Sequence, residues 1–202
     1  MLELAILGSL KERPMHGYQL SREMGEALGG LWRVSYGSLY PTLRRLERLG
    51  EVETVPDESV GSGRRKHVYR ITEKGEAAFL ELLQEAPGDT NSEDTRFRVR
   101  LAFFRYLPPE TRIRLLERRR AALQERLNTI ADSQRTARLR DDDYTKALID
   151  HGRSATRSDI EWLDALILAE QTKSANGETR QSSGRGGKER RTSALRRKER
   201  TS

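Results

Sequence analysis

Residues 35–50, SYGSLYPTLRRLERLG, have the pattern of an amphipathic helix with arginine on its polar side. At 100° per residue, four leucines fall on one face: Leu39, Leu43, Leu46 and Leu49. The other face carries a proline and three arginines: Pro41, Arg44, Arg45 and Arg48. The leucine face predicts packing onto a core. The arginine face is suited to phosphate, although most such faces are simply solvated.

Two short helices are expected before this stretch. Residues 2–10 and residues 15–28 both repeat apolar side chains at helical spacing. The central helix begins after an N-cap that is either Ser35 or Ser38, and Pro41 fits a helix only near its first turn. Gly50 is placed to end that helix as a C-terminal capping glycine.

A hairpin and a fourth helix are expected after Gly50. The run 51–55, EVETV, contains β-branched residues, and 64–71, RRKHVYRI, has strand bias at its end. The segment between them, PDESVGSG, has the composition of a turn. Thr72 is a candidate N-cap for a helix that reaches Leu83. The order of helix, helix, helix, strand, strand and helix is that of a winged helix.

A set of residues with a defined order and spacing runs through this region: Pro14, His16, Gly17, Tyr18, Gly37, Ser38, Leu39, Tyr40, Pro41, Leu43, Arg45, Leu46, Glu47, Gly50, Arg65, Lys66, Tyr69, Thr72 and Gly75. In this pattern the chain resembles the PadR family of bacterial transcriptional regulators, which are winged-helix repressors. The resemblance implies an N-terminal DNA-binding domain followed by C-terminal helices that form a homodimer.

The expected fold is therefore mainly α-helical with a small β-hairpin wing. We expect four segments in chain order: a winged helix-turn-helix domain at 1–86, a linker at 87–93, a helical dimerisation domain at 94–170 and a disordered basic tail at 171–202. The tail holds ten Lys and Arg residues against three Asp and Glu residues. Its net charge is therefore +7, the same as that of the whole chain. It is either a plain spacer or an arm that attracts DNA without sequence preference.

Two long helices are expected in the dimerisation domain. The first has a seam that steps by three and four residues: Ile113, Leu116, Arg120, Leu123, Leu127, Ile130 and Gln134. That seam packs either on a helix of the same subunit or on a second subunit. The second helix, about 143–169, has a wide apolar face that suggests burial on two sides.

The sequence offers no constellation typical of an enzyme. Its three histidines, His16, His67 and His151, do not have the spacing of metal ligands, and cysteine is absent. A phosphate-binding glycine loop and a nucleophile elbow are also absent from the sequence. We therefore expect a protein that is not an enzyme, binds no metal or cofactor, has no membrane span and is located in the cytoplasm.

The predicted DNA contacts come from the helix 35–50, as the recognition helix, and from a wing at 61–70. The candidate residues are Tyr18, Ser38, Tyr40, Pro41, Arg44, Arg45, Arg48, Arg64, Arg65 and Lys66. Five of them are assigned to base edges or adjacent backbone: Ser38, Tyr40, Pro41, Arg44 and Arg45. The other five, Tyr18, Arg48 and the three wing cations, are assigned to phosphates. Tyr40 has an alternative place, buried between helices.

The sequence therefore predicts a homodimeric transcriptional regulator of the repressor type, which binds double-stranded DNA at an inverted-repeat operator. The alternative is a winged helix that docks on a protein partner instead of DNA. Trp162 is a candidate contact for a small-molecule effector, because some regulators of the PadR family hold planar aromatic effectors near the dimer interface. Ordinary core packing is the competing role for Trp162.

Overall fold

The computed structural model describes residues 1–27, 34–56, 67–85, 93–137 and 142–198, without the side chains of 27, 132–137 and 176–198. It divides into two compact units, Met1–Leu107 and Pro108–Ser202. Both units are mainly helical, and the first contains a small antiparallel sheet, so the predicted fold class is confirmed. No helix within the described residues is both long enough and apolar enough to cross a membrane.

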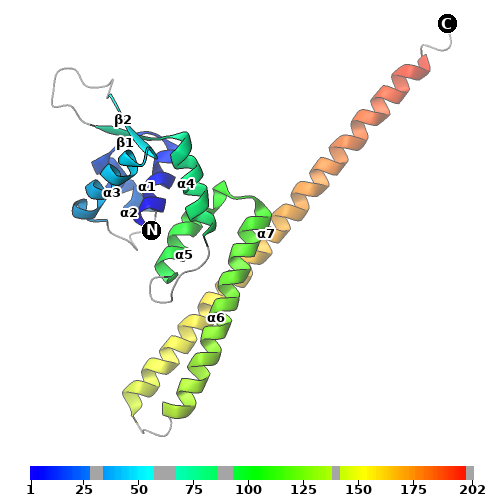
Figure 1. Ribbon diagram of the computed structural model, residues 1–202. Helices are drawn as coiled ribbons and strands as arrows, with labels where there is room; N and C mark the ends of the chain where they lie inside the picture. The colour runs from blue at the N-terminus through cyan, green and yellow to red at the C-terminus, as the bar shows by residue number, and fades with distance from the viewer. Residues whose placement is uncertain (28–33, 57–66, 86–92, 138–141, 199–202) are drawn as a thin grey trace. The chain divides into compact units, whose positions relative to one another are not determined.

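The first unit combines helices with three short strands (Figure 1). Its elements in chain order are α1 (Leu2–Glu12), β1 (Met15–His16), α2 (Gly17–Ala27), α3 (Tyr36–Arg48), β2 (Val52–Val55), β3 (Val68–Ile71), α4 (Glu73–Gln84), α5 (Glu93–Ala102) and the 3₁₀ turn η1 (Phe104–Tyr106). The predicted order of three helices, two strands and a helix is present, with one strand added.

The added strand is β1, whose residues we expected to open the second helix. The strand order is β1-β3-β2, and both pairs are antiparallel. Met15 pairs with Tyr69 of β3, and its side chain is only 2% exposed. The burial of Met15 and the pairing to β3 hold this dipeptide extended, and α2 begins directly after it.

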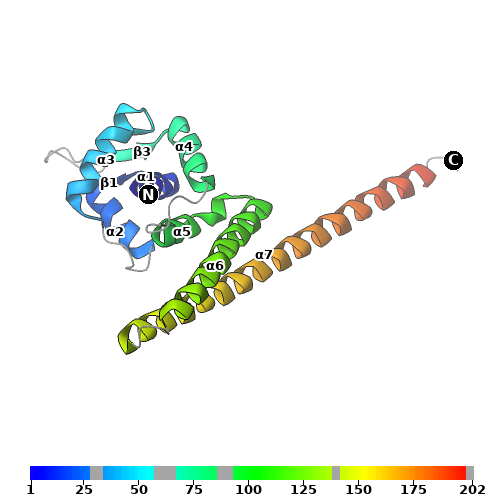
Figure 2. The same cartoon turned by 60° about the horizontal axis from the view of Figure 1, so that its bottom comes forward.

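Helix α1 lies at the centre of the first unit, surrounded by the other elements (Figure 2). Every residue from Leu4 to Leu10 is buried. A Cβ added at Gly8 would fall 2.5 Å from the ring of Phe103, so this glycine makes room for the aromatic ring. Phe103 in turn packs edge-to-face on Phe79 of α4, at 5.7 Å between centroids. These contacts form the core on which α3 rests.

Both ends of α3 are closed by local hydrogen bonds. The Ser35 side chain accepts a hydrogen bond from the backbone N–H of Ser38, which identifies Ser35 as the N-cap. At the other end, the N–H of Gly50 donates to the carbonyl of Glu47, and the N–H of Glu51 donates to that of Leu46. Gly50 has a φ of 71°, so the pattern is a Schellman motif and confirms the predicted capping glycine.

The end of α3 is tied to the start of α4. The Thr72 hydroxyl donates to the carbonyl of Gly50 at 2.7 Å and accepts from the N–H of Gly75, which makes Thr72 the N-cap of α4 as predicted. Lys74 donates to the carbonyl of Leu49, also at 2.7 Å. A Cβ on Gly75 would fall 2.0 Å from the carbonyl oxygen of Glu51, so only glycine fits this crossing. These contacts fix the orientation of α3.

Helix α5 belongs to the first compact unit, although the segment 94–170 was expected to form one helical domain. Its Phe97 is 6% exposed and packs edge-to-face on Phe104 at 6.2 Å. Glu93 and Arg100 form an ion pair in which both side chains are buried. The aromatic residues after α5 contribute to the core around α1, which explains why this segment clusters with the N-terminal helices.

The second unit is an antiparallel hairpin of two helices, α6 (Pro109–Ala137) and α7 (Asp143–Lys198), which lie side by side in both ribbon views (Figures 1 and 2). Ion pairs set its register: Arg112 with Glu170 at 2.9 Å, and Arg120 with Asp164. Leu116 of the predicted seam is 1% exposed. Leu123 of the seam is 3% exposed, so the middle of the seam packs within the subunit, which was one of its two expected roles, and Arg120 interrupts it to pair with Asp164 of α7.

Helix α7 continues to Lys198, through most of the segment that we expected to be a disordered tail. The sequence from 171 to 198 contains no proline, but it contains four glycines, which disfavour a helix interior. The expectation of disorder rested on the Gly, Ser, Thr, Gln and Arg composition and on the near absence of large apolar residues, which leaves little to offset the entropy of ordering, and it stays a prediction.

Candidate nucleic-acid interface

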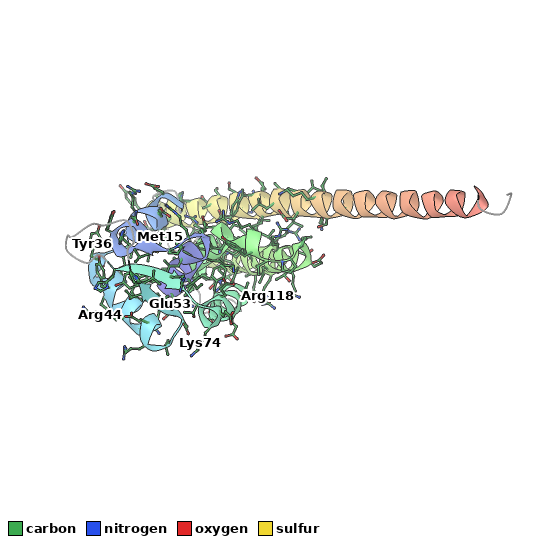
Figure 3. The ribbon with its side chains drawn as sticks, turned by 90° about the horizontal axis from the view of Figure 1, so that it is seen from above. Met15, Tyr36, Arg44, Glu53, Lys74 and Arg118 are labelled. Atoms are coloured by element: carbon green, nitrogen blue, oxygen red, sulfur yellow. The ribbon has the colours of Figure 1, made fainter. Side chains whose placement is uncertain are left out.

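Helix α3 has one buried face and one exposed face. Leu39, Leu43 and Leu46 are at most 1% exposed, as their spacing predicted. Leu49, the fourth leucine, is 44% exposed because it lies at the C-cap, where the helix turns away from the core. On the other side, Tyr36 and Arg44 lie at the outer edge of the first unit (Figure 3).

The exposed face begins with serines that cap the helix. The Ser38 hydroxyl donates to the carbonyl of Ser35 at 3.0 Å and lies 3.0 Å from the Ser35 hydroxyl. Ser38 is exposed as predicted, but its proton is used by the cap. Its oxygen can still accept a hydrogen bond from a ligand.

Pro41 is the sixth residue of α3, one turn further into the helix than expected. Having no N–H, it cannot donate to the carbonyl of Gly37, four residues earlier. Gly37 has no side chain, and within the part of the chain that the structure describes a Cβ there would meet only the Ser35 hydroxyl oxygen, at 3.9 Å. The backbone around Gly37 is thus open on the exposed side, and the proline is accommodated beside it.

Tyr40 occupies both of the places that were expected for it. It is 40% exposed, and a Cβ added at Gly17 would fall 2.9 Å from its ring. Its edge therefore lies against the start of α2, and its face stacks on Tyr36, with centroids 6.3 Å apart and 23° between the rings. Tyr36 is 58% exposed and was not among the predicted contacts. Its position four residues before Tyr40 could have identified it, because such residues share a helix face.

Arg44 extends from the middle of α3 and is exposed. Its charge acts on Tyr69 of the central strand. Burial first, and then the negative charge of Glu47, raise the pKa of Tyr69 above its ordinary value of 10.0, whereas Arg44 lowers it. Glu47 also accepts a hydrogen bond from Thr54 of β2 at 2.6 Å. Helix α3 is therefore connected to the sheet by its polar residues as well as by its leucines.

Arg45 forms an ion pair with Glu3 of α1. Its side chain is 49% exposed, so it is accessible, but a carboxylate already neutralises part of its charge. The amino group of Met1 lies close to the same region. Burial, and next the charge of Arg96, hold the pKa of this amine below its ordinary value of 8.0, and Arg45 contributes in the same direction. Arg44 is thus better placed than Arg45 to contact an anionic ligand.

Arg48 and Tyr18 complete the described candidates. Arg48 is exposed at the last residue of α3. Tyr18, in the first turn of α2, is 48% exposed and stacks on His16 at 5.6 Å between centroids. His16 Nδ1 is 3.2 Å from the carbonyl oxygen of His67, so this histidine joins β1 to the residue that precedes β3.

The wing residues Arg64, Arg65 and Lys66 lie outside the described residues. The strands on either side of the wing are described, and they form a regular pair from Val52–Ile71 to Val55–Val68. A cross-strand ion pair, Glu53 with Arg70 at 2.8 Å, covers the outer face of this hairpin.

We define the reading surface as six exposed side chains, five on α3 and one in the first turn of α2: Tyr36, Tyr40, Pro41, Arg44, Arg48 and Tyr18. It combines aromatic rings that carry hydroxyl groups with two cations. Among the described residues, no group of three or more histidine, aspartate or glutamate side chains is arranged to hold a metal ion. The surface is suited to contact with a polyanion that also offers apolar and hydrogen-bonding edges.

Comparison with known proteins identifies the family. Residues 6–81 match the model described as "Transcriptional regulator PadR-like family". The transcriptional regulator Rv3488 of Mycobacterium tuberculosis is 40% identical over 80 residues, which cover 40% of this chain and 70% of the relative. The chain belongs to the PadR-like family of transcriptional regulators. The PadR-like match contains all of α2, α3 and the hairpin, and therefore the whole reading surface.

Other matches extend the comparison. The negative transcriptional regulator PadR of Bacillus subtilis is 29% identical over 83 residues, which cover 41% of this PadR-like chain and 45% of the relative. Residues 95–169 match the model "Virulence activator alpha C-term". Among solved structures, Bacillus subtilis PadR in complex with operator DNA is 18% identical, with 84% of this chain and 97% of that chain covered and a TM-score of 0.41.

Proposed function

We propose that this PadR-like regulator is a DNA-binding repressor that binds an inverted-repeat operator as a homodimer. The observation that carries the proposal is the two-sided character of α3. Three leucines of its apolar face, Leu39, Leu43 and Leu46, are buried in the core, and its aromatic and cationic face is exposed and available for a ligand. The exposed N-terminal half of such a helix would enter the major groove, as in other helix-turn-helix domains.

In the proposed complex, the residues have separate tasks. Arg44 is the candidate for contact with a base edge, since arginine donates two hydrogen bonds to guanine. Arg48, Tyr18 and the wing cations Arg64, Arg65 and Lys66 would bind phosphates and fix the register of the helix. Arg45 would contribute less than its position suggests, because Glu3 competes with phosphate for it.

The homodimer is supported by an apolar stripe on α7, made of Tyr144, Leu148, Ala155 and Trp162. These residues are spaced so that they share one helix face, and all four are exposed. Tyr144 is 90% exposed and Leu148 is 70% exposed, which is unusual for large side chains on one line of a helix. The other apolar face of α7, with Leu163 at 1% exposure, is already covered within the hairpin. We expect a second subunit to cover the stripe.

The proposed repressor role is supported by a relative, and the proposed inverted repeat by the symmetry of a dimer. The Bacillus subtilis relative is named a negative regulator, which favours repression for this chain. A two-fold dimer would place two α3 helices in equivalent orientations, so that its site must contain two inverted half-sites. Trp162 remains a candidate effector contact because it is 44% exposed on the dimerisation stripe.

The proposal is tested by selection of bound sequences from a random duplex library with the purified full chain, together with sedimentation of the free protein. We expect a dimer, and enrichment of one inverted repeat with half-site centres about one DNA turn apart, or a multiple of it. A chain that enriches no sequence would contradict the proposal and would favour the alternative role as a protein-interaction module.

A further inference from the structure

The reading surface contains an aromatic side chain, Tyr36, that is not part of the buried core. Tyr36 is the first residue of α3 and is 58% exposed, more than Tyr18 or Tyr40. The leucines in the middle of α3 are buried, whereas Tyr36 and its stacking partner Tyr40 both have exposed rings, and Tyr36 is the more exposed of the two. Exposure at this position is therefore a feature to be explained by a ligand.

The ring of Tyr36 is held in place before any ligand binds. It stacks on Tyr40, whose own edge lies against Gly17 at the start of α2. A tyrosine has only two side-chain torsions, so a single stacking partner restricts it strongly and reduces the entropy that it would lose on binding. Tyr40 thus acts as the support, and Tyr36 as the outer ring.

The described neighbours of Tyr36 leave space beside the backbone at Gly37. Among the described residues, a Cβ at Gly37 would have only the Ser35 hydroxyl oxygen within 4 Å, at 3.9 Å. The Ser38 hydroxyl donates its proton to the carbonyl of Ser35. At the start of α3, then, an exposed aromatic side chain lies beside polar side chains that hydrogen-bond to each other.

Apolar contact at the N-terminal end of a recognition helix matches one feature of the DNA major groove. Thymine presents a 5-methyl group there, and apolar side chains distinguish it from the other bases by contact with that methyl group. We propose that Tyr36 is a specificity-determining residue that recognises a thymine in each half-site through its 5-methyl group. This inference rests on the proposed function, because it presupposes that α3 enters the major groove.

The test replaces thymine by uracil, which removes only the methyl group, at each thymine of the selected site in turn. The wild-type full chain should bind one substituted position per half-site about fourfold more weakly, the equivalent of about 0.8 kcal/mol for one methyl group. Tyr36→Phe should keep this pattern, since the ring is retained. Tyr36→Ala should bind the thymine and uracil duplexes equally at that position.

Tyr18→Ala is the matched control. It also removes an exposed tyrosine beside α3, and it should weaken binding while leaving the uracil pattern of the wild type unchanged. A wild-type chain that binds its site but is insensitive to every uracil substitution would overturn the inference and leave the proposed function standing. Uracil sensitivity that persists in Tyr36→Ala would overturn the inference in the same way. A chain that selects no DNA would overturn both.

Discussion

Helices α3 and α7 each have a buried apolar face and, in addition, large side chains that are exposed. The two helices differ in which side chains are exposed and in where these lie along the helix. In α3 the leucines are buried within the chain, and the exposed large side chains are tyrosines grouped near the N-terminus. In α7 one apolar face is buried in the hairpin, while Tyr144, Leu148 and Trp162 are exposed along the helix. Exposed tyrosines beside arginines are suited to a polar ligand, whereas an extended apolar stripe needs a protein surface.

The comparison is sharpest for two leucines, Leu43 in α3 and Leu148 in α7. Leu43 is 0% exposed and Leu148 is 70% exposed. Leu43→Ala should lower the free energy of unfolding by about 2–5 kcal/mol, because it leaves a cavity in the core. Urea unfolding of the purified variant checks this expectation: the midpoint should fall while the dependence of the free energy of unfolding on urea concentration stays the same.

Leu148→Ala should leave the fold of the subunit unchanged and weaken the dimer. Each dimer would lose two leucine contacts, so its dissociation constant, measured by sedimentation, should rise about tenfold or more. If Leu148→Ala leaves the dissociation constant unchanged, then the stripe on α7 is not the dimer interface, and the difference between the two helices has another cause.

Another prediction concerns the ion pair between Glu3 and Arg45. Glu3→Gln should release Arg45 for phosphate, so that binding to all DNA sequences becomes tighter and more sensitive to salt. One added phosphate contact should steepen the log-log salt dependence by about 0.9. Binding titrations on random duplex over a range of salt concentrations measure this slope.

Glu12→Gln is the control for that experiment. Glu12 is also on α1 and pairs with Arg105, away from α3. It should leave the salt dependence as it is in the wild type. An unchanged slope for Glu3→Gln, or one that becomes shallower, would show that Arg45 does not gain access to phosphate.

The smallest expected effect is a pH dependence of stability from the amino group of Met1. Burial, with Arg96, lowers the pKa of this amine below 8.0, so the folded state disfavours its protonated form. Between the lowered pKa and 8.0 the unfolded chain binds more protons, and stability therefore rises with pH in this window. The free energy of unfolding in urea should be measured as a function of pH for the chain with a free amine and with an acetylated amine. It should rise more steeply with pH for the free amine. Two parallel curves would contradict the lowered pKa of the Met1 amine.

The fold was largely accessible from sequence because it depends on local signals. The leucine spacing of α3, the N-cap at Thr72 and the capping Gly50 each act over a few residues, and all three are found as predicted. Strand β1 was missed because two residues carry no periodicity, and only pairing with Val68 and Tyr69 makes them a strand. The inclusion of α5 in the first unit likewise depends on long-range aromatic packing.

The site was accessible in part for the same reason. Periodicity predicts that Tyr40 and Arg44 lie on the polar side of α3, and both are exposed there. It does not predict the ion pair of Arg45, because Glu3 is 42 residues away in the sequence and approaches only through the packing of α1. Tyr36 was not predicted, although its position four residues before Tyr40 places both side chains on one helix face; periodicity gives that face, but it does not give the exposure of a ring in the first turn.

The central claim is that the exposed face of α3 reads a DNA sequence, and Arg44→Ala tests it most directly. Competition binding should compare the selected site with random duplex for the wild type, for Arg44→Ala and for Arg118→Ala, whose arginine is exposed on α6 in the second unit. Arg44→Ala should reduce the preference for the selected site by about 5- to 150-fold, corresponding to about 1–3 kcal/mol for one arginine–guanine pair, whereas Arg118→Ala should preserve it. An Arg44→Ala protein that keeps the full preference of the wild type would contradict the account.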